Sequence, residues 1–332
     1  MIRPARHPAV VLVPFLSLAL VVAAACGAGA ASTVPSIAPS DAAPSPSAAA
    51  FPVTLIDDEG TEVTIDAEPR RIASLTPANT EIAFAVGAGD RVVATDDGSD
   101  TPAEAAALPD VATFDSVDVE AVVGADVDLV LAGGLGFTNA DAISQLRDLG
   151  VPVLVLYAPS VEGVYDDIQL VGDATGTSAV AAELVTSLRT EMDDIAATVA
   201  EGDHPRVFYE VGYTDSTGEI FAPAEDSFVA EMVTMAGGDV ITTGDPQSYA
   251  ISLEALIEAD PEVIVLGTNP FYQPTPEQVT ARPGWGVMSA VRDGSIVAVH
   301  DTEITRPGPR LPIGLRNLAA AVRPDVTLPP AP

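Results

Sequence analysis

The chain has 332 residues, 48% of them hydrophobic, and its 14 arginines, absence of lysine and 48 acidic residues give a formal net charge of −34 at pH 7. This charge excludes nucleic acid and anionic membrane surfaces as favourable partners. The hydrophobic content and the regular spacing of apolar residues exclude a largely disordered chain, and a salty extracellular setting would explain the acidic surface.

The first 50 residues carry the pattern of an exported lipoprotein. Two arginines precede an apolar run over 9–25, and Cys26, the only cysteine, follows three alanines. We therefore expect a signal peptide over 1–25 and a lipid on Cys26 that anchors the protein to the outer face of the cell membrane. The alternative is an uncleaved membrane anchor, but the apolar run over 9–25 is close to the shortest length that can span a bilayer. Residues 26–50 are rich in Ala, Ser and Pro, which predicts a disordered spacer.

The region 51–175 predicts a first α/β lobe. It opens with a hairpin, Val53–Ile56 and Glu62–Ile65, across a turn that ends in Gly60. Strands and helices then alternate, which is typical of a parallel sheet covered by helices. The expected strands are 72–75, 91–95, 129–131 and 153–156, and the expected helices are 80–86, 140–149 and 161–174.

The segment 176–201 predicts one long helix. Apolar residues recur at helical spacing through Thr177–Ala200, with Gly176 before the helix and Gly202 after it. At 1.5 Å per residue such a helix is roughly 36 Å long, enough to cross a domain. It is either a crossover helix within one sheet or a connection between two lobes.

A repeat on both sides of this helix favours two lobes. Residues 118–133 and 252–267 align without a gap at an offset of 134, so that Glu120 matches Glu254 and both copies read as a short helix, a tight turn and a buried strand. A second lobe over 202–324, with a tail at 325–332, is therefore expected. Its elements are the strands 206–211, 263–265 and 295–300, an apolar turn at 220–222, and the helices 228–236 and 311–322. The fold class is α/β, with two Rossmann-like lobes joined by a single long helix.

Motifs for catalysis are scarce. Beyond the expected signal peptide the only histidines are His204 and His300. The sequence has no nucleophile elbow, P-loop or dinucleotide fingerprint. The sequence therefore predicts neither an enzyme nor a resident metal or cofactor, and we expect His300 with its acidic neighbours to form a solvated strand end. An extracellular hydrolase with Asp and Glu pairs in a cleft, and a purely structural surface lipoprotein, are the alternatives from other classes.

Three parts of the chain resemble the metal-chelate receptors of ABC importers, which bind vitamin B12, ferric siderophores or haem. These are 70–102 with its TPANTE motif, both repeat copies, and 281–310 with its RPGW and RPGPR motifs, which are most similar to the B12-binding branch. The resemblance spans 51–324 and implies the helical-backbone periplasmic-binding-protein fold. It also implies a ligand between the lobes, a cobalt or iron chelate with cobalamin favoured and a ferric siderophore or haem as alternatives. The implied partners are the permease and the ATPase of an ABC importer, and we expect a monomer.

Candidate ligand-binding residues follow from the resemblance and from strand ends. Ligands of parallel sheets bind beyond the carboxyl ends of the strands, and Phe137 and Phe271 follow the two repeat strands at the same offset, although core packing would also explain either ring. Phe114 stands where cobalamin binders have an aromatic residue. The full set is Thr76, Pro77, Asn79, Phe114, Phe137, Tyr213, Tyr249, Phe271, Tyr272 and Arg306.

Charged and metal-ligating side chains also have expected roles at the ligand site. Arg306 and Arg310 would face the cleft or brace its rim, where an anionic chelate would find few other guanidinium groups. An axial ligand for haem would have to be Tyr213 or His300.

Glu120 and Glu254 occupy the same place in the two repeat copies, in the first turn of a helix where a carboxylate also interacts favourably with the helix dipole. The resemblance implies that these two glutamates, one on each lobe, meet arginines of the membrane permease. The helix dipole explains either residue alone, but it does not explain why both lobes keep the same acid in the same register.

Overall fold

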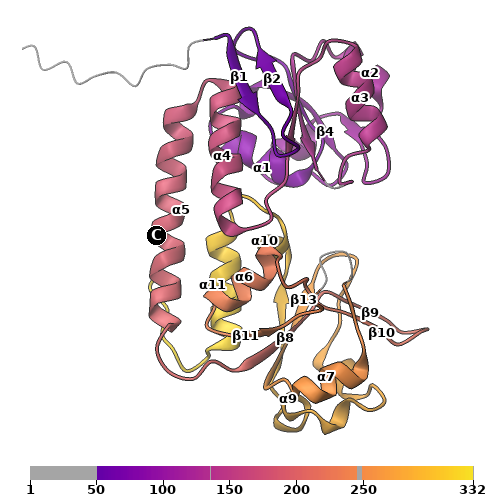
Figure 1. Ribbon diagram of the computed structural model, residues 1–332, viewed down its shortest axis with the longest axis vertical. Helices are drawn as coiled ribbons and strands as arrows, with labels where there is room; N and C mark the ends of the chain where they lie inside the picture. Colours follow the sequence, from indigo (N-terminus) through magenta and orange to yellow (C-terminus); the bar gives the residue numbers. More distant parts are fainter. Residues whose placement is uncertain (1–50, 135, 245–248, 332) are drawn as a thin grey trace, which may run out of the picture. The chain divides into compact units, whose positions relative to one another are not determined.

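Two parallel sheets, one in each half of the chain, form the framework of the protein (Figure 1). The structure is a computed structural model that describes residues 51–134, 136–244 and 249–331. The expected signal peptide, the Cys26 lipidation site and the 26–50 spacer lie outside these residues. Among the helices that the structure describes, none is both long and apolar enough to cross a membrane.

The first lobe begins with the expected antiparallel hairpin and continues as a five-stranded parallel sheet. The strands are β1 (Val53–Ile56), β2 (Glu62–Ile65), β3 (Ile72–Ser74), β4 (Val92–Asp96), β5 (Asp110–Ala112), β6 (Leu129–Gly133) and β7 (Val153–Leu156), and the helices are α1 (Pro77–Ala85), α2 (Val119–Gly124), α3 (Ala140–Asp148) and α4 (Val161–Thr175). The sheet order is β5-β4-β3-β6-β7, with neighbouring strands parallel. Strand β6 is buried at every residue, as expected for a sheet covered on both faces.

The second lobe has a four-stranded parallel sheet and a small antiparallel sheet. The parallel strands are β8 (Arg206–Glu210), β11 (Asp239–Ile241), β13 (Val263–Thr268) and β14 (Ile296–His300), and the antiparallel ones are β9 (Gly212–Thr214), β10 (Glu219–Phe221) and β12 (Ala250–Ile251). The helices are α6 (Phe228–Met235), α7 (Leu253–Ala259), α8 (Pro276–Thr280), α9 (Ser289–Asp293), α10 (Thr302–Thr305) and α11 (Leu311–Val322).

The strand orders support duplication of a lobe. In the second lobe the parallel order is β11-β8-β13-β14, which matches β4-β3-β6-β7 of the first lobe, with the two repeat strands β6 and β13 in the same place. The short helices before these strands, α2 and α7, are both capped by the expected residues: the Asp118 side chain accepts the N–H of Ala121, and the Ser252 side chain accepts the N–H of Ala255.

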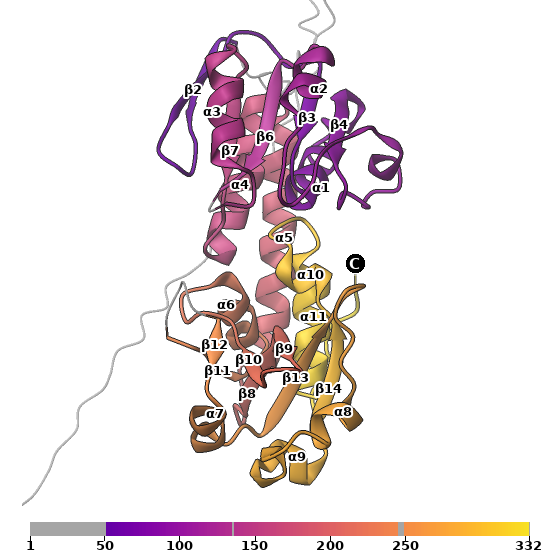
Figure 2. The ribbon, with the colours of Figure 1, turned by 90° about the vertical axis from the view of Figure 1, so that its right-hand side faces the viewer.

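Helix α5 (Ser178–Val199) connects the two lobes and confirms the expected long helix. It has 22 residues and packs against α4 of the first lobe and α11 of the second (Figures 1 and 2). Its buried residues recur at helical spacing; they are Ala181, Leu188, Met192, Ile195 and Val199.

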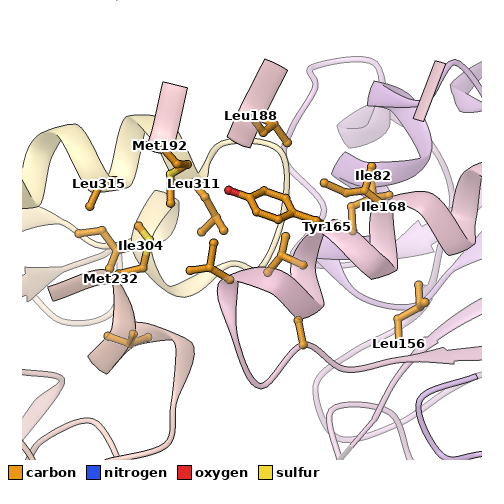
Figure 3. Close-up of a cluster of buried hydrophobic side chains, with 14 of the residues drawn as sticks. Ile82, Leu156, Tyr165, Ile168, Leu188, Met192, Met232, Ile304, Leu311 and Leu315 are labelled. Carbon is orange, nitrogen blue, oxygen red and sulfur yellow. The ribbon is translucent and has the colours of Figure 1, made fainter. Parts of the chain in front are cut away.

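A continuous apolar core extends from one lobe to the other. Figure 3 shows Tyr165 of α4 between Ile168 and Leu311, and all three side chains are almost completely buried. Met192 of α5 and Met232 of α6 extend the same cluster into the second lobe (Figure 3). Because protein cores are close-packed, this cluster joins the lobes more firmly than a flexible linker would.

Two local expectations are corrected. The helix expected to begin at Thr80 begins at Pro77, because proline lacks an N–H and its fixed φ suits the first position of a helix. The apolar turn expected at 220–222 is instead strand β10, since Ile220 pairs with Tyr213 of β9 and with Ile251 of β12. Strand β10 was missed because its partner strands are distant in sequence. The start of α1 was placed too late because its first residues were assigned to the preceding loop.

Candidate ligand-binding cleft

A cavity of about 330 Å³ is lined by residues of both lobes. From the first lobe come the segments that follow β3, β6 and β7, and from the second come residues after β8, at the start of α6 and after α10. Apart from Asp167 of α4, the first-lobe residues therefore lie at the carboxyl ends of parallel strands, which is where such sheets bind ligands. Six of the expected binding residues line the cavity, namely Thr76, Pro77, Asn79, Phe137, Tyr249 and Arg306.

Aromatic rings and prolines dominate the walls of this cleft. The rings are Phe137, Tyr157, Phe228 and Tyr249, and the prolines are Pro77, Pro159, Pro223 and Pro307. Phe137 is 55% exposed and Tyr249 is 51% exposed, so both rings offer uncovered surface. Rings and prolines bury apolar area at a low cost in conformational entropy, which suits a flat, rigid ligand.

Three polar side chains of the cleft form hydrogen bonds with the protein's own backbone. The Asn79 amide donates to the carbonyl of Ala132 at 3.0 Å, and Thr305 donates to the carbonyl of Asp301 at 2.9 Å. Ser227 caps α6 by accepting the N–H of Ala230. These groups shape the cleft and hold its segments in place.

Arg306 lines the cleft, but its guanidinium is already paired. Its Nη1 lies 2.8 Å from Asp100 and 3.1 Å from Glu81, both in the first lobe. Arg310 binds the same Glu81 through two nitrogens, at 2.8 and 2.7 Å, and also contacts Glu303. These ion pairs join the two lobes, because both arginines belong to the second lobe and their shared partner Glu81 lies on α1 of the first.

Asp167 is the carboxyl group in the wall of the cleft. It is 4% exposed and lies on α4. Burial, together with a hydrogen bond to the Asp58 carboxyl, raises its pKa to about 9. Asp58 is held in turn by the N–H of Tyr157, whose own phenol pKa is raised by burial and by the nearby Tyr249 and Asp226. The side chains of Tyr157 and Tyr249 line the cleft from opposite lobes.

Tyr213 and Tyr272 do not line the cleft. The Arg282 guanidinium lies 3.7 Å from the centre of the Tyr213 ring, which also packs edge-on against Trp285 at 6.1 Å. Arg282 forms a buried ion pair with Glu210, which accepts the Tyr272 hydroxyl at 2.6 Å. Burial, together with hydrogen bonding to this carboxylate, raises the pKa of Tyr272. The RPGW motif therefore forms a packed structural cluster, because the ion pair with the Glu210 carboxylate holds Arg282 within it.

Two expected aromatic residues point into solvent instead. Phe114 is 74% exposed and Phe271 is 99% exposed, and neither lines the cleft. Asn269 accepts the N–H of Phe271 and of Tyr272, so the turn directs Phe271 outward. His300 pairs with Glu303 at 2.7 Å on an exposed strand end, as expected, and does not reach the cleft.

Sequence reasoning missed Tyr157, Asp167 and Phe228. Tyr157 directly follows a correctly expected strand, so the rule about strand ends could have found it. Asp167 carried no such signal, since it is one acid among several on an amphipathic helix. Within the part of the chain that the structure describes, no group of three or more His, Cys, Asp or Glu residues is arranged to hold a metal ion.

Glu120 and Glu254 lie on the surface in the first turns of α2 and α7. Neither side chain has a hydrogen bond or ion pair to any residue that the structure describes. Both carboxylates are therefore free to meet a partner.

Comparison with known proteins adds to this geometry. Residues 72–302 match the family model described as periplasmic binding protein. The chain is 34% identical over 280 residues to an uncharacterised ABC transporter substrate-binding lipoprotein of Bacillus subtilis (strain 168), with 83% of this chain and 87% of that protein covered. It is 30% identical over 317 residues to a cobalamin-binding protein of Halobacterium salinarum (strain ATCC 29341 / DSM 671 / R1), with 92% and 82% covered. A crystal structure of a possible iron-binding, periplasmic solute-binding protein from Staphylococcus epidermidis ATCC 12228 matches with a TM-score of 0.67 and 26% identity, over 77% of this chain and 100% of that one.

Proposed function

Because the chain belongs to the periplasmic binding protein family, we propose that it captures a corrinoid, with cobalamin as the first candidate, and delivers it to an ABC importer. It is a substrate-binding protein and not an enzyme, as expected, so the alternative of an extracellular hydrolase is set aside. The relative from Halobacterium salinarum, which covers most of the chain, is named for cobalamin binding and supports this choice of ligand.

The observation that carries the proposal is the lining of the cleft. Four rings and four prolines surround a cavity whose one guanidinium is already paired with two carboxylates. A corrin is a flat macrocycle fringed with uncharged amides, and it would place its faces against the rings while its amides meet hydroxyl and carbonyl groups. Small-molecule sites of this kind are mostly apolar, with few polar groups.

A ferric chelate is the second candidate, and Tyr157 and Tyr249 favour it. Phenols serve as axial ligands of haem iron in some proteins, and these two tyrosines reach the cleft from opposite lobes. The earlier candidates for that role, Tyr213 and His300, lie outside the cleft. The relative from Staphylococcus epidermidis, described as possibly iron-binding, points the same way.

The proposal includes how the protein meets the membrane and the importer. Cys26 carries the lipid anchor, and Glu120 and Glu254 dock onto arginines of the permease, one from each lobe of a monomeric receptor. The substrate-binding lipoprotein of Bacillus subtilis supports the anchor. Replacing Cys26 with Ala should release the protein from the membrane or leave it unprocessed, as fractionation of cells would detect. Retention of a processed variant in the membrane would contradict lipidation.

The ligand is tested by thermal unfolding and calorimetry of the purified full chain. Cyanocobalamin, cobinamide, ferrioxamine B and haem are added separately, each at a large excess. A ligand present at 100 times its Kd stabilises the folded state by about 2.7 kcal/mol, which is readily measured as a rise in Tm. Stabilisation by corrinoids supports the proposal, and stabilisation by haem or ferrioxamine B alone would replace the corrinoid by the second candidate. No response to any of the four would contradict the role as a chelate receptor.

A further inference from the structure

A buried hydrogen-bond network lies behind the wall of the cleft, at the carboxyl ends of β3 and β4. The Asp96 carboxylate accepts the Ser99 hydroxyl with one oxygen and the Gly98 N–H, at 3.0 Å, with the other. The Thr80 hydroxyl lies 2.8 Å from the Ser99 hydroxyl and 2.8 Å from the Ser74 hydroxyl. The residues that contribute these four side chains are at most 6% exposed, and none of them lines the cavity.

Hydrogen bonds make this buried position tolerable for the Asp96 carboxylate. Burial raises the pKa of the Asp96 carboxyl, whereas the hydrogen bonds from Ser99 and Gly98 lower it. A buried charge is costly unless hydrogen bonds replace the water that it loses, so the carboxylate depends on these two donors. A buried polar network whose members are satisfied also makes its surroundings rigid. Loss of one hydroxyl should therefore loosen the segment 97–100, which the network holds.

This segment touches two residues of the cleft wall, one from each lobe. Gly98 packs so closely on Pro77 that a Cβ at this position would lie 3.1 Å from the Pro77 ring. The Arg306 guanidinium lies 2.8 Å from the Asp100 carboxylate and 3.4 Å from the Gly98 carbonyl oxygen. Pro77 and Arg306 both line the cavity. Displacement of the segment 97–100 would therefore move both parts of the wall.

Thr80 connects the network to a third part of the wall. Its hydroxyl lies 3.1 Å from the carbonyl oxygen of Thr76, which lines the cavity and directly precedes α1. Thr76 is also packed against β6, since a Cβ at Gly133 would lie 2.7 Å from the Thr76 methyl group. The network thus joins the segment after β3 to the segment after β4 beneath the cleft.

We infer that the Asp96–Ser99–Thr80 network positions the ligand site. It fixes the segment 97–100, and this segment determines where Pro77 and Arg306 stand in the cleft. The inference rests on the proposed function, since it concerns the same ligand site. A site that is already held in its binding geometry loses less conformational freedom when the ligand binds. Loss of the network should therefore weaken binding although no contact to the ligand is removed.

Two threonines of the first lobe provide a matched test. Thr80 and Thr175 are both 0% exposed, and each hydroxyl contacts the carbonyl oxygen of the residue four positions earlier. Thr175 lies at the end of α4, away from the network and from the cleft lining. Thr80→Val and Thr175→Val should both lower the midpoint of urea unfolding, because each variant loses the hydrogen bonds of a buried hydroxyl.

Chelate affinity and hydrogen exchange separate the two variants. Calorimetry on the purified full chain uses whichever of cyanocobalamin, cobinamide, ferrioxamine B and haem binds the wild-type protein most tightly. Thr80→Val should weaken this binding by about 10-fold, whereas Thr175→Val should bind as the wild type does. Thr80→Ser restores the hydroxyl and should recover most of the affinity. Without ligand, the amides of 97–100 should exchange faster in Thr80→Val than in the wild type, and at the wild-type rate in Thr175→Val.

The outcomes separate the positioning role from the receptor role. Wild-type affinity in Thr80→Val, equal losses of affinity in the two valine variants, or unchanged exchange at 97–100 in Thr80→Val would overturn the positioning role and leave the receptor role intact. Absence of binding of all four chelates to the wild-type protein would refute the proposed function, and the positioning role with it. If Thr80→Val does not fold, Ser99→Ala takes its place with the same expected loss, and wild-type affinity in that variant counts against the inference.

Discussion

Removal of the Glu81 carboxylate should destabilise the protein strongly, because this side chain joins the two lobes from a buried position. Only 3% of the side chain is exposed, and it accepts hydrogen bonds from Arg306 at 3.1 Å and from Arg310 at 2.8 and 2.7 Å. Glu81→Gln leaves two guanidinium groups with one carboxylate partner each, Asp100 for Arg306 and Glu303 for Arg310. Breaking a buried pair by removing one partner costs about 3 to 5 kcal/mol.

The lower end of that range applies here. Arg306 and Arg310 are 22% and 24% exposed, so water offsets part of the loss, and each keeps a second carboxylate. We therefore expect Glu81→Gln to lower the free energy of unfolding by about 3 kcal/mol, measured by urea unfolding of the full chain at pH 7. Chelate affinity should fall as well, since the pairs that cross from one lobe to the other also border the cleft.

An exposed pair of the same residue types provides the control. Glu162 and Arg189 join α4 to α5, and their side chains are 59% and 42% exposed. Exposed pairs of this kind are screened by water and contribute little, so Glu162→Gln should leave the free energy of unfolding nearly unchanged. The reasoning is refuted by equal losses in the two variants, or by a Glu81→Gln protein as stable as the wild type.

Three more predictions follow from the cleft and the surface. Phe137→Ala should weaken chelate binding by about 1 kcal/mol in calorimetry, whereas Phe271→Ala, which removes a ring outside the cleft, should not. Glu120→Arg with Glu254→Arg should leave chelate affinity intact and abolish uptake and ligand-stimulated ATPase activity; normal transport would contradict the docking role. The pKa of Asp167 is raised to about 9, so the folded state keeps a proton that the unfolded chain releases above its ordinary pKa of 3.8, and stability from this group falls as pH rises between these values. The slope is at most about 1.4 kcal/mol per pH unit, and Asp167→Asn should remove it in urea unfolding from pH 5 to 8.

The architecture could be predicted from the sequence because its signals are local or repeated. Helical spacing identified α5 to within a residue at each end, and the last helix, α11, has the expected bounds. The gapless repeat alone predicts equivalent positions for β6 and β13, and the strand orders agree with it. Elements that depend on distant partners were missed, and the short strands β5, β11 and β12 are examples.

Residue type alone could not place the aromatic side chains. Tyr213 and Phe137 both follow strands, yet Tyr213 packs under Arg282 while Phe137 lines the cleft. The difference arises because Arg282 pairs with Glu210, 72 residues earlier in the chain, and the ion pair holds the guanidinium over the tyrosine ring. No spacing rule predicts such a pairing.

Several acidic residues that match between the two repeat copies stabilise the backbone conformation of their lobes. Asp126 and Asp260 both adopt left-handed conformations, with φ of 51° and 44°, where Asp is tolerated better than most residues. Asp128 accepts the backbone N–H groups of Arg70 and Arg71 just before β3, and Glu262 accepts the backbone N–H of Arg206 at the start of β8. These acids are therefore kept in register by the turn and strand geometry that both lobes share.

The same explanation does not extend to Glu120 and Glu254. Both are exposed, and neither has a hydrogen bond or ion pair to a described residue. Within the described part of the fold they interact only with the dipole of their helix, and any acidic residue in the first turn would do the same. An exposed acidic side chain contributes to association when a cationic partner approaches it. It then influences the orientation and rate of encounter more than the affinity of the complex. Uptake by the wild-type protein should therefore slow as ionic strength rises, since screening weakens attraction between exposed charges. With either glutamate changed to Gln, the salt dependence of uptake should become shallower while chelate affinity stays constant; an unchanged salt dependence would show that the two carboxylates match by descent alone.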